Sequence, residues 1–178
     1  MAFTIREGDI TRFEGDAIVN AANTQLKMGG GVCGAIFRAA GADQLRQACD
    51  PLAPISTGEA VITPGFSLAA KHVIHTAGPV YEGGHRQEEK LLRDSYIHSL
   101  ELAKDKGLSS VAFPLISSGI YGYPVAEALQ IAIESIETFI EDNPMDVTLY
   151  LFSMDTYLKD QSIPESLRAY LKEKLVRR

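Results

Sequence analysis

Residues 16–41 have the sequence DAIVNAANTQLKMGGGVCGAIFRAAG, in which a β-rich run, a polar segment, three glycines and a small-residue run follow one another. We predict a strand over residues 17–20, then an irregular loop and a helix. Glycine has no Cβ and the first turn of a helix has unpaired N–H groups, so this backbone can approach a ligand closely. The positive end of the helix dipole favours an anion there. Taken alone, the pattern also fits a flexible loop that leads into a helix.

A second strand, loop and helix pattern occupies residues 111–124, with the sequence VAFPLISSGIYGYP. We predict a strand over residues 111–115 and a helix with Pro124 in its first turn. Between them, the hydroxyls of Ser117 and Ser118 and the amides of residues 119–121 could surround a phosphate without any cation. Alone this segment also fits a common turn, but two such loops at one sheet edge would suit a diphosphate.

Short β-rich runs alternate with helical patterns along the chain, which is typical of an α/β layer fold. The predicted strands cover residues 3–6, 17–20, 60–63, 72–75, 111–115 and 147–152. The clearest helices cover residues 88–106, 124–142 and 164–176, with the apolar spacing of helices that have one buried face. The length of 178 residues, without a low-complexity linker, favours one domain over residues 1–178.

The composition narrows the class of protein. With 17 basic and 23 acidic side chains, the formal net charge is -6, which argues against a domain that binds nucleic acid by neutralising phosphates. Cys33 and Cys49 lack the spacing of zinc ligands, so we expect no structural metal. No apolar run reaches the ~20 residues needed to cross a bilayer, and the N-terminus lacks the apolar core of a signal peptide. We therefore expect a cytoplasmic protein with reduced thiols and no membrane partner.

Three polar residues follow predicted strands and are candidates for binding a sugar or a base. Asn20 and Asn23 flank a strand end, where open α/β sheets bind their ligands, and an amide can both donate to and accept from a ribose hydroxyl. Asn20 equally fits a residue that stabilises its own turn. Asp9 could cap a turn, or accept a hydrogen bond from an exocyclic amine such as that of adenine. The four histidines show no triad spacing, so we expect them to pack or to lie at the surface.

Gly29, Gly31 and Gly34 also match the literal glycine pattern of a dinucleotide-binding fold. In that fold the strand leads directly into the first glycine, whereas a polar, irregular segment, residues 21–28, separates them here. We therefore reject a nicotinamide-binding protein.

Six segments of the sequence, taken in order, resemble the macrodomain family, and the match is close to the branch that includes mono-ADP-ribosyl hydrolases. The segments are Gly8 to Thr11, Asp16 to Asn23, Gly29 to Gly34, Thr57 to Ala60, Val73 to Pro79 and Ile116 to Pro124. The resemblance implies a three-layer α/β/α sandwich around a central mixed sheet of six strands. It also implies that the chain binds ADP-ribose, free or attached to a protein, across the strand ends and without a cofactor.

The resemblance implies roles for particular residues of this chain. Asp9 would accept from the adenine amino group with the Ile10 backbone beside it, and Asn23 would bind the distal ribose. Phe152 would lie against adenine, although an aromatic residue that ends a core strand also fits the core. The implied ligand-binding set is Asp9, Ile10, Asn20, Asn23, Gly30, Gly31, Val32, Cys33, Gly34, Ser117, Ser118, Gly119, Ile120, Tyr121 and Phe152.

One position departs from the family pattern. The related hydrolases have an Asp after Gly-Gly-Gly-Val, whereas this chain has Cys33, and a neutral thiol cannot act as a carboxylate base. One hypothesis is an enzyme that hydrolyses an ester of ADP-ribose, linked to a protein Asp or Glu or present as O-acetyl-ADP-ribose. Its water would be held by Asn23, the glycine loop and a diphosphate oxygen. The alternative is a reader module that releases ADP-ribose unchanged.

The part that Cys33 itself plays has two interpretations. It is either a small, unreactive residue that fills space or, as a sharper hypothesis, a nucleophile or a redox-sensitive gate activated at the helix N-terminus. Asn23 and Cys33 are thus the two candidate catalytic residues.

Overall fold

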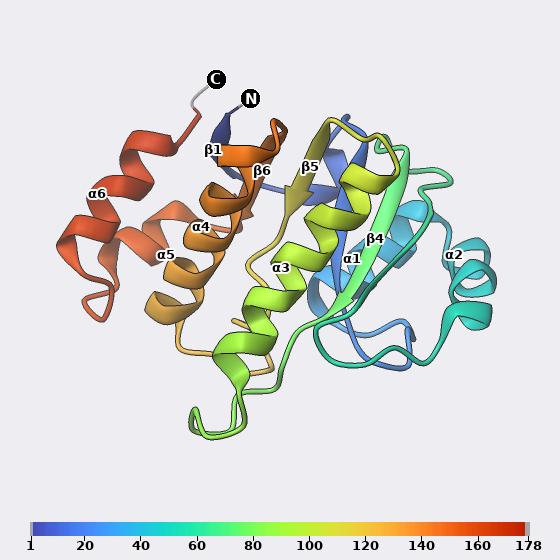
Figure 1. Cartoon of the computed structure of the whole chain (residues 1–178), viewed down its shortest axis with the longest axis horizontal. Coiled ribbons are helices and arrows are strands. Elements are labelled where there is room, and N and C mark those ends of the chain that lie inside the picture. The colour runs from blue at the N-terminus through green and yellow to red at the C-terminus, as the bar shows by residue number, and fades with distance from the viewer. Residues whose placement is uncertain (1, 177–178) are drawn as a thin grey trace.

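The computed structural model describes residues 2–176 and places six strands of this range in one mixed sheet (Figure 1). The strand order is β1-β6-β5-β2-β4-β3, and β3 is the strand that runs antiparallel to its neighbour. The strands are β1 (Phe3–Glu7), β2 (Ala17–Ala22), β3 (Ala60–Pro64), β4 (His72–Ala77), β5 (Ser110–Phe113) and β6 (Asp146–Leu151). All six predicted strands are confirmed to within two residues at each end.

Two strands end earlier than predicted. β5 ends at Phe113 rather than at residue 115, since Pro114 has no N–H with which to continue the ladder. β6 ends at Leu151, so Phe152 lies beyond the sheet. Both differences move residues of the predicted strands into the loops at the sheet edge.

Helices cover both faces of the sheet. α3 (Glu88–Asp105) and α4 (Val125–Asp142) lie across one face, whereas α1 (Gly31–Ala40) and α2 (Ala42–Cys49) pack on the other (Figure 1). α5 (Met154–Lys159) and α6 (Glu165–Lys174) follow β6. The four predicted helices are confirmed as α1, α3, α4 and α6, with Pro124 as the N-cap of α4 rather than a residue of its first turn. α2 and α5, like the short 3-10 helices η1 (Ile10–Arg12) and η2 (Asp50–Leu52), were not predicted.

The strands divide their side chains between two apolar cores. Val19 and Ile74 belong to the core under α3 and α4, whereas their neighbours Ile18 and Val73 belong to the core under α1 and α2. Successive residues of a strand point to opposite faces, so a sheet covered on both sides needs apolar residues throughout. The predicted three-layer α/β/α sandwich is therefore confirmed. No helix within residues 2–176 is both long and apolar enough to cross a membrane.

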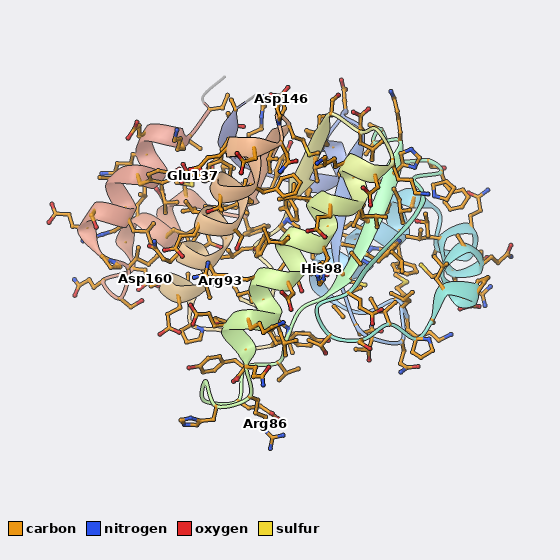
Figure 2. The ribbon with its side chains drawn as sticks, viewed as in Figure 1. Arg86, Arg93, His98, Glu137, Asp146 and Asp160 are labelled. Carbon is orange, nitrogen blue, oxygen red and sulfur yellow. The ribbon has the colours of Figure 1, made fainter. Side chains whose placement is uncertain are left out.

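Polar contacts join α3 to its neighbours. Arg93 lies between α3 and α4, where its guanidinium donates to Glu134 Oε2 at 2.8 Å (Figure 2). His98 lies on another side of α3, with its Nδ1 2.7 Å from the carbonyl oxygen of Gly58. The prediction that the histidines pack or lie at the surface is confirmed, since His75 is buried, His72 is half-buried, and His85 and His98 are exposed.

The parallel strands bring their carboxyl ends to one edge of the sheet. β1, β6, β5, β2 and β4 share one direction, so the loops that follow them meet there. The two glycine-containing loops follow β2 and β5, which are direct neighbours. Open α/β sheets bind ligands in the crevice outside this edge. The fold therefore places both loops where a ligand site is expected.

Candidate functional site

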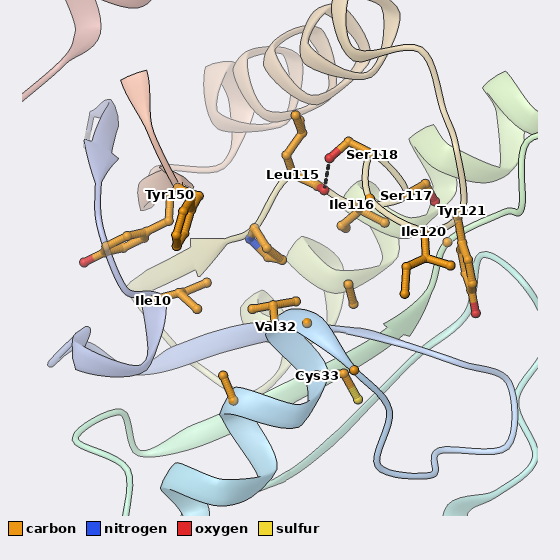
Figure 3. A pocket seen from close by; sticks show the side chains of 18 of the residues that line it. Ile10, Val32, Cys33, Leu115, Ile116, Ser117, Ser118, Ile120, Tyr121 and Tyr150 are labelled. Atoms are coloured by element: carbon orange, nitrogen blue, oxygen red, sulfur yellow. Dashed lines mark hydrogen bonds between the residues drawn. The ribbon is translucent and has the colours of Figure 1, made fainter. Parts of the chain in front are cut away.

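A cavity of about 810 Å³ opens at this edge of the sheet. Its volume is within the range of small-molecule sites, about 300–1,000 Å³. Loops that follow β1, β2, β4, β5 and β6 all contribute to its wall. Val32 and Cys33, at the N-terminal end of α1, face the loop that carries Ser117 to Tyr121 (Figure 3). Except for Asn20 and Gly34, every residue of the predicted ligand-binding set lines the cavity.

The first glycine loop presents free main-chain N–H groups to this cavity. Gly30 is the N-cap of α1, and Gly31 has a φ of 57°, which a residue with a side chain rarely adopts. Within residues 2–176, the amides of residues 29–33 donate to no protein acceptor. These orphan donors lie at the positive end of the helix dipole, so the loop is suited to an anion.

The second loop presents free N–H groups from the opposite wall. The amides of residues 118–121 also lack a protein acceptor within the described range. The loop is fixed by its own main chain, since Tyr123 N donates to the Ser117 carbonyl at 2.9 Å and Gly122 N to the Gly119 carbonyl at 3.0 Å. Two sets of main-chain donors therefore converge on one cavity that needs no lysine or arginine to hold an anion.

The two serines of the second loop differ in what their hydroxyls do. Ser118 Oγ donates to the Leu115 carbonyl at 2.9 Å, so this hydroxyl holds its own turn (Figure 3). Ser117 is buried with a φ of 66°, and its Oγ has no hydrogen-bond partner within residues 2–176. A buried polar atom without a partner costs free energy. The Ser117 hydroxyl therefore lies in the packing beside Gly78 rather than open to the cavity, and this loop offers its main-chain N–H groups to a ligand.

Gly78 allows the second loop to lie close to the end of β4. A Cβ built on Gly78 would lie 2.4 Å from Ile116 Cγ2 and 2.4 Å from Ser117 Oγ. Any side chain would therefore push the loop away. Gly78 also lines the cavity, which the sequence analysis did not predict, although a glycine directly after a buried strand was a usable signal.

The end of the cavity beside β1 and β6 is aromatic and carries one carboxylate. Asp9 Oδ1 accepts from Thr11 N at 2.9 Å and from Thr11 Oγ1 at 2.7 Å, so the interpretation of Asp9 as a turn cap is confirmed. Its place on the cavity wall leaves the adenine contact as a prediction. Phe152 is 90% exposed, so its interpretation as a core residue is wrong, because β6 ends before it.

Tyr150 and Tyr157 join Phe152 on this wall. Both are absent from the predicted set. Tyr150 could have been found, because residues two apart on a strand share a face and Tyr150 precedes Phe152 by two. Tyr157 depends on α5, a short helix without a clear apolar period. The other lining residues that the prediction missed are Gly8, Ala21, Ala22, Gly29, Ala35, Pro114, Leu115 and Ile116.

Asn23 lines the cavity, but part of its amide holds the first loop. Its Nδ2 donates to the Lys27 carbonyl at 2.9 Å, and its Oδ1 accepts from Lys27 N at 3.1 Å. An Asn side chain has two N–H donors and two acceptor lone pairs. One donor and one lone pair therefore remain for a ligand or a water molecule.

Two predicted ligand-binding residues do not reach the cavity. Asn20 is 1% exposed and turns toward His75, with its Nδ2 3.1 Å from His75 Nδ1. Its place in the set is corrected, because a residue of β2 that points into the sheet packing lies behind the wall. Gly34 is also corrected: a Cβ there would lie 2.6 Å from the Gly29 carbonyl oxygen, so this glycine allows α1 to pack on its own loop.

Cys33 lies on the cavity wall but is 5% exposed. Its Sγ is 3.7 Å from Asn20 Nδ2 and 3.7 Å from the Lys27 carbonyl oxygen. The sulfur is therefore packed between the strand behind it and the loop in front of it. Near it, burial lowers the pKa of His75 to about 4, so this imidazole is neutral at pH 7. Burial also raises the pKa of the Cys49 thiol to about 11.

No group of three or more His, Cys, Asp or Glu residues within the range 2–176 is placed to hold a metal ion. Whatever chemistry the cavity supports therefore depends, within that range, on main-chain N–H groups, Asn23, Cys33, the hydroxyls and the aromatic wall.

Comparisons with known proteins agree on one family. The model of the Macro domain family matches residues 19–132. An O-acetyl-ADP-ribose deacetylase of Cronobacter turicensis is 50% identical over 153 residues, which cover 84% of this chain and 86% of the relative. A mutant of the Oceanobacillus iheyensis macrodomain, solved with ADPR, has a TM-score of 0.84 at 40% identity, covering 95% of this chain and 90% of that one. A Trypanosoma brucei macrodomain in complex with ADP-ribose has a TM-score of 0.78 at 40% identity, covering 87% of this chain and 66% of that one.

Proposed function

The chain belongs to the macrodomain family, and on that premise we propose that it binds ADP-ribose and hydrolyses the ester bond of O-acetyl-ADP-ribose. The observation that carries this proposal is the convergence of free N–H groups from residues 29–33 and 118–121 on one cavity. A diphosphate has the charge and the number of acceptor oxygens to use such donors from both walls. No cofactor takes part in this reaction.

The two ends of the cavity suit the two ends of the ligand. Phe152, Tyr150 and Tyr157 offer aromatic surface at the end near Asp9, where an adenine ring would stack and its amino group would donate to the carboxylate. Asn23 lies on the loop between β2 and α1 and Cys33 in the first turn of α1, where the distal ribose would lie. The diphosphate would then span the middle, between the two glycine-bearing loops.

The proposed hydrolysis adds one water to the acyl carbonyl carbon. Asn23 orients this water through the N–H and lone pair that Lys27 leaves unused. A diphosphate oxygen takes one proton from the water as the carbon–oxygen bond forms, which gives a tetrahedral intermediate. The intermediate then breaks the bond between the acyl carbon and the ribose oxygen, and the departing oxygen takes the proton. The products are acetic acid and ADP-ribose.

A reader module is the second candidate, and Cys33 is the observation that favours it. The Cys33 thiol is hydrogen-bonded to the Lys27 carbonyl and supplies no carboxylate base. The barrier to hydrolysis would therefore be higher than with an Asp at this position. A factor of ten in turnover corresponds to only about 1.4 kcal/mol of barrier, which is less than one good hydrogen bond to a charged group. Binding without turnover is therefore compatible with the same geometry.

Two measurements on the wild-type chain separate these functions. Calorimetry with ADP-ribose tests binding, and chromatography of O-acetyl-ADP-ribose incubated with the protein tests turnover. We expect both. Failure to bind would overturn the proposal entirely, and binding without product above the buffer control would leave the reader module. An aspartate- or glutamate-linked ADP-ribosylated protein, followed by loss of label on a gel, extends the test to protein esters.

Variants then assign the chemistry. Cys33→Asp should raise the rate if the missing carboxylate limits turnover, and an unchanged rate would show that the phosphate-assisted route suffices. Asn23→Ala should weaken binding and turnover. Asn143→Ala is its matched control, because the Asn143 amide also donates to a main-chain carbonyl, at the end of α4 and away from the cavity.

We also propose that residues 1–178 form one domain that works in the cytoplasm, where the buried thiols of Cys33 and Cys49 would stay reduced.

A further inference from the structure

A buried line of polar side chains runs behind the cavity wall from β3 to the first glycine loop. Asn20 of β2 and His75 of β4 are paired by the register of the two strands, and both are at most 1% exposed. Asn20 Nδ2 lies 3.1 Å from His75 Nδ1 and 3.7 Å from Cys33 Sγ. Neither Asn20 nor His75 lines the cavity, so neither touches a ligand there.

Two side chains contact the far side of His75: Thr63 Oγ1 lies 3.0 Å and Cys49 Sγ 3.7 Å from His75 Nε2. When the Thr63 hydroxyl donates to the Pro64 carbonyl, 3.1 Å away, its oxygen accepts from Nε2. His75 is then the neutral tautomer that carries its proton on Nε2. Its Nδ1 must accept a hydrogen bond, and Asn20 Nδ2 is the donor within reach.

The direction of the hydrogen bond at His75 decides which atoms donate and which accept at Asn20 and Cys33. One N–H of Asn20 points to His75, and the other points to the sulfur of Cys33. The sulfur therefore acts as an acceptor from Asn20, and its S–H is left to donate to the Lys27 carbonyl, 3.7 Å away. Sulfur is a weak hydrogen-bonding atom, so the geometry of its neighbours decides where the thiol points.

The main chain of Lys27 connects this line of polar side chains to Asn23. The Lys27 carbonyl accepts from Asn23 Nδ2 and from Cys33 Sγ, and its N–H donates to Asn23 Oδ1. Lys27 stands two residues before Gly29, at the entrance to the free amides of residues 29–33. Both candidate catalytic residues are thus hydrogen-bonded to one main-chain carbonyl just before the glycine loop.

We propose that His75 and Asn20 are positioning residues of this site, which hold Cys33 against the Lys27 carbonyl and so align Asn23 and the amides of the first loop. This inference rests on the proposed function, because alignment matters when those groups bind the ligand. The free-energy cost of one buried polar atom supports this proposal. Asn20 Oδ1 is buried without a partner within residues 2–176, a penalty that an apolar residue would avoid.

The key variants are His75→Leu and His75→Asn. Leucine removes both ring nitrogens, whereas the Asn carbonyl oxygen can take the place of Nδ1 and accept from Asn20. Thr63→Val removes only the anchor at the far end and is the milder variant should His75→Leu fail to fold. Ile136→Val is the control for general destabilisation, since Ile136 is fully buried in the core on the other face of the sheet.

Two readouts are measured for each variant: the Kd of ADP-ribose by calorimetry, and the 15N–1H chemical shifts of residues 29–33 and 118–121 without ligand. We expect His75→Leu to weaken binding about tenfold, from the loss of one well-placed hydrogen bond, and to shift the amides of residues 29–33 but not those of 118–121. Thr63→Val should do the same to a smaller extent. His75→Asn should restore most of both readouts, and Ile136→Val should change neither.

Certain outcomes would overturn the proposal. A Kd for His75→Leu within twofold of the wild type would do so, as would equal shifts in both loops or no recovery in His75→Asn. Failure of the wild-type chain to bind ADP-ribose would overturn the proposed function instead. In that case the ligand-free amide shifts still test whether His75 positions the first loop.

Discussion

The two glycine-bearing loops face each other across the cavity and present free amides by different means. Side chains hold the first loop, since Asn23 and Cys33 are both hydrogen-bonded to the main chain of Lys27. The second loop is held by its own main chain and by close packing against Gly78. The first loop therefore depends on polar side chains that reach into the sheet, whereas the second depends on the space that one glycine leaves.

The two loops thus present main-chain donors to one cavity without sharing a sequence motif, and each depends on its own support. Gly29 and Gly30 precede α1 and Gly31 begins it, whereas the loop before α4 places Ser117 at a φ of 66° and carries the strain of a non-glycine residue there. Each loop should consequently fail in its own way when its support is removed.

Acidification should lower the stability of the whole chain through His75. The folded chain keeps His75 neutral until about pH 4, whereas the unfolded chain protonates it near pH 6.5. The unfolded state binds the extra proton in that window, so the free energy of unfolding falls as the pH falls from 6.5 to 4. The difference corresponds to roughly 3 kcal/mol. Urea unfolding at several pH values measures it.

The control for this prediction is His75→Asn, which should flatten the dependence on pH between 6.5 and 4. Asp16 titrates below this window, because the Ser109 N–H and smaller contributions lower its pKa to about 2. An equal slope in the wild type and in His75→Asn would contradict the assignment.

Gly78→Ala should break the second loop and spare the first. The new Cβ would overlap Ile116 and Ser117, and an overpacked site of this kind costs about 2 kcal/mol, which is about thirtyfold in the Kd of ADP-ribose. Ile136→Val is the control for general destabilisation, because Ile136 is fully buried and does not line the cavity. Calorimetry measures both. Comparable losses in the two variants would show that the second loop does not depend on the close approach at Gly78.

Asn23→Ala should loosen the first loop and remove the proposed ribose contact. We expect binding to weaken about tenfold, from the loss of about 1.5 kcal/mol of hydrogen bonding, and turnover to fall with it. Calorimetry and product analysis measure the two effects. Unchanged values of both would remove the assignment of Asn23 to the ribose.

Ser117→Ala should have the smallest effect, because it removes one hydroxyl and keeps the backbone conformation and its strain. Ser117 Oγ is buried without a partner, so the substitution loses no hydrogen bond, and we expect the Kd of ADP-ribose to stay within about twofold of the wild type. Ser118→Ala should weaken binding more, by about fivefold, because its hydroxyl donates to the Leu115 carbonyl and holds the turn, a hydrogen bond of about 1 kcal/mol. Calorimetry measures both, and the reverse order would show that the Ser117 hydroxyl contacts the ligand.

Much of the fold could be predicted from local patterns. The alternation of β-rich runs and helical patterns located six strands and four helices, and the strand, loop and helix order around residues 16–41 and 111–124 located both loops. α2 and α5 were missed because they are 8 and 6 residues long, too short for a clear apolar period. Tyr157, carried by α5, was missed with it.

The sequence alone determined the layered architecture, the two glycine-bearing loops and most of the residues around the cavity, because period and glycine placement are local properties of the chain. The tertiary structure decided which side chains reach the cavity and which support it from behind. Asn20 and Asn23 are three residues apart and of one chemical type, yet strand pairing turns Asn20 toward His75 while the loop carries Asn23 to the cavity wall. That choice depends on partners 55 residues away in the chain, and no local pattern encodes such a contact.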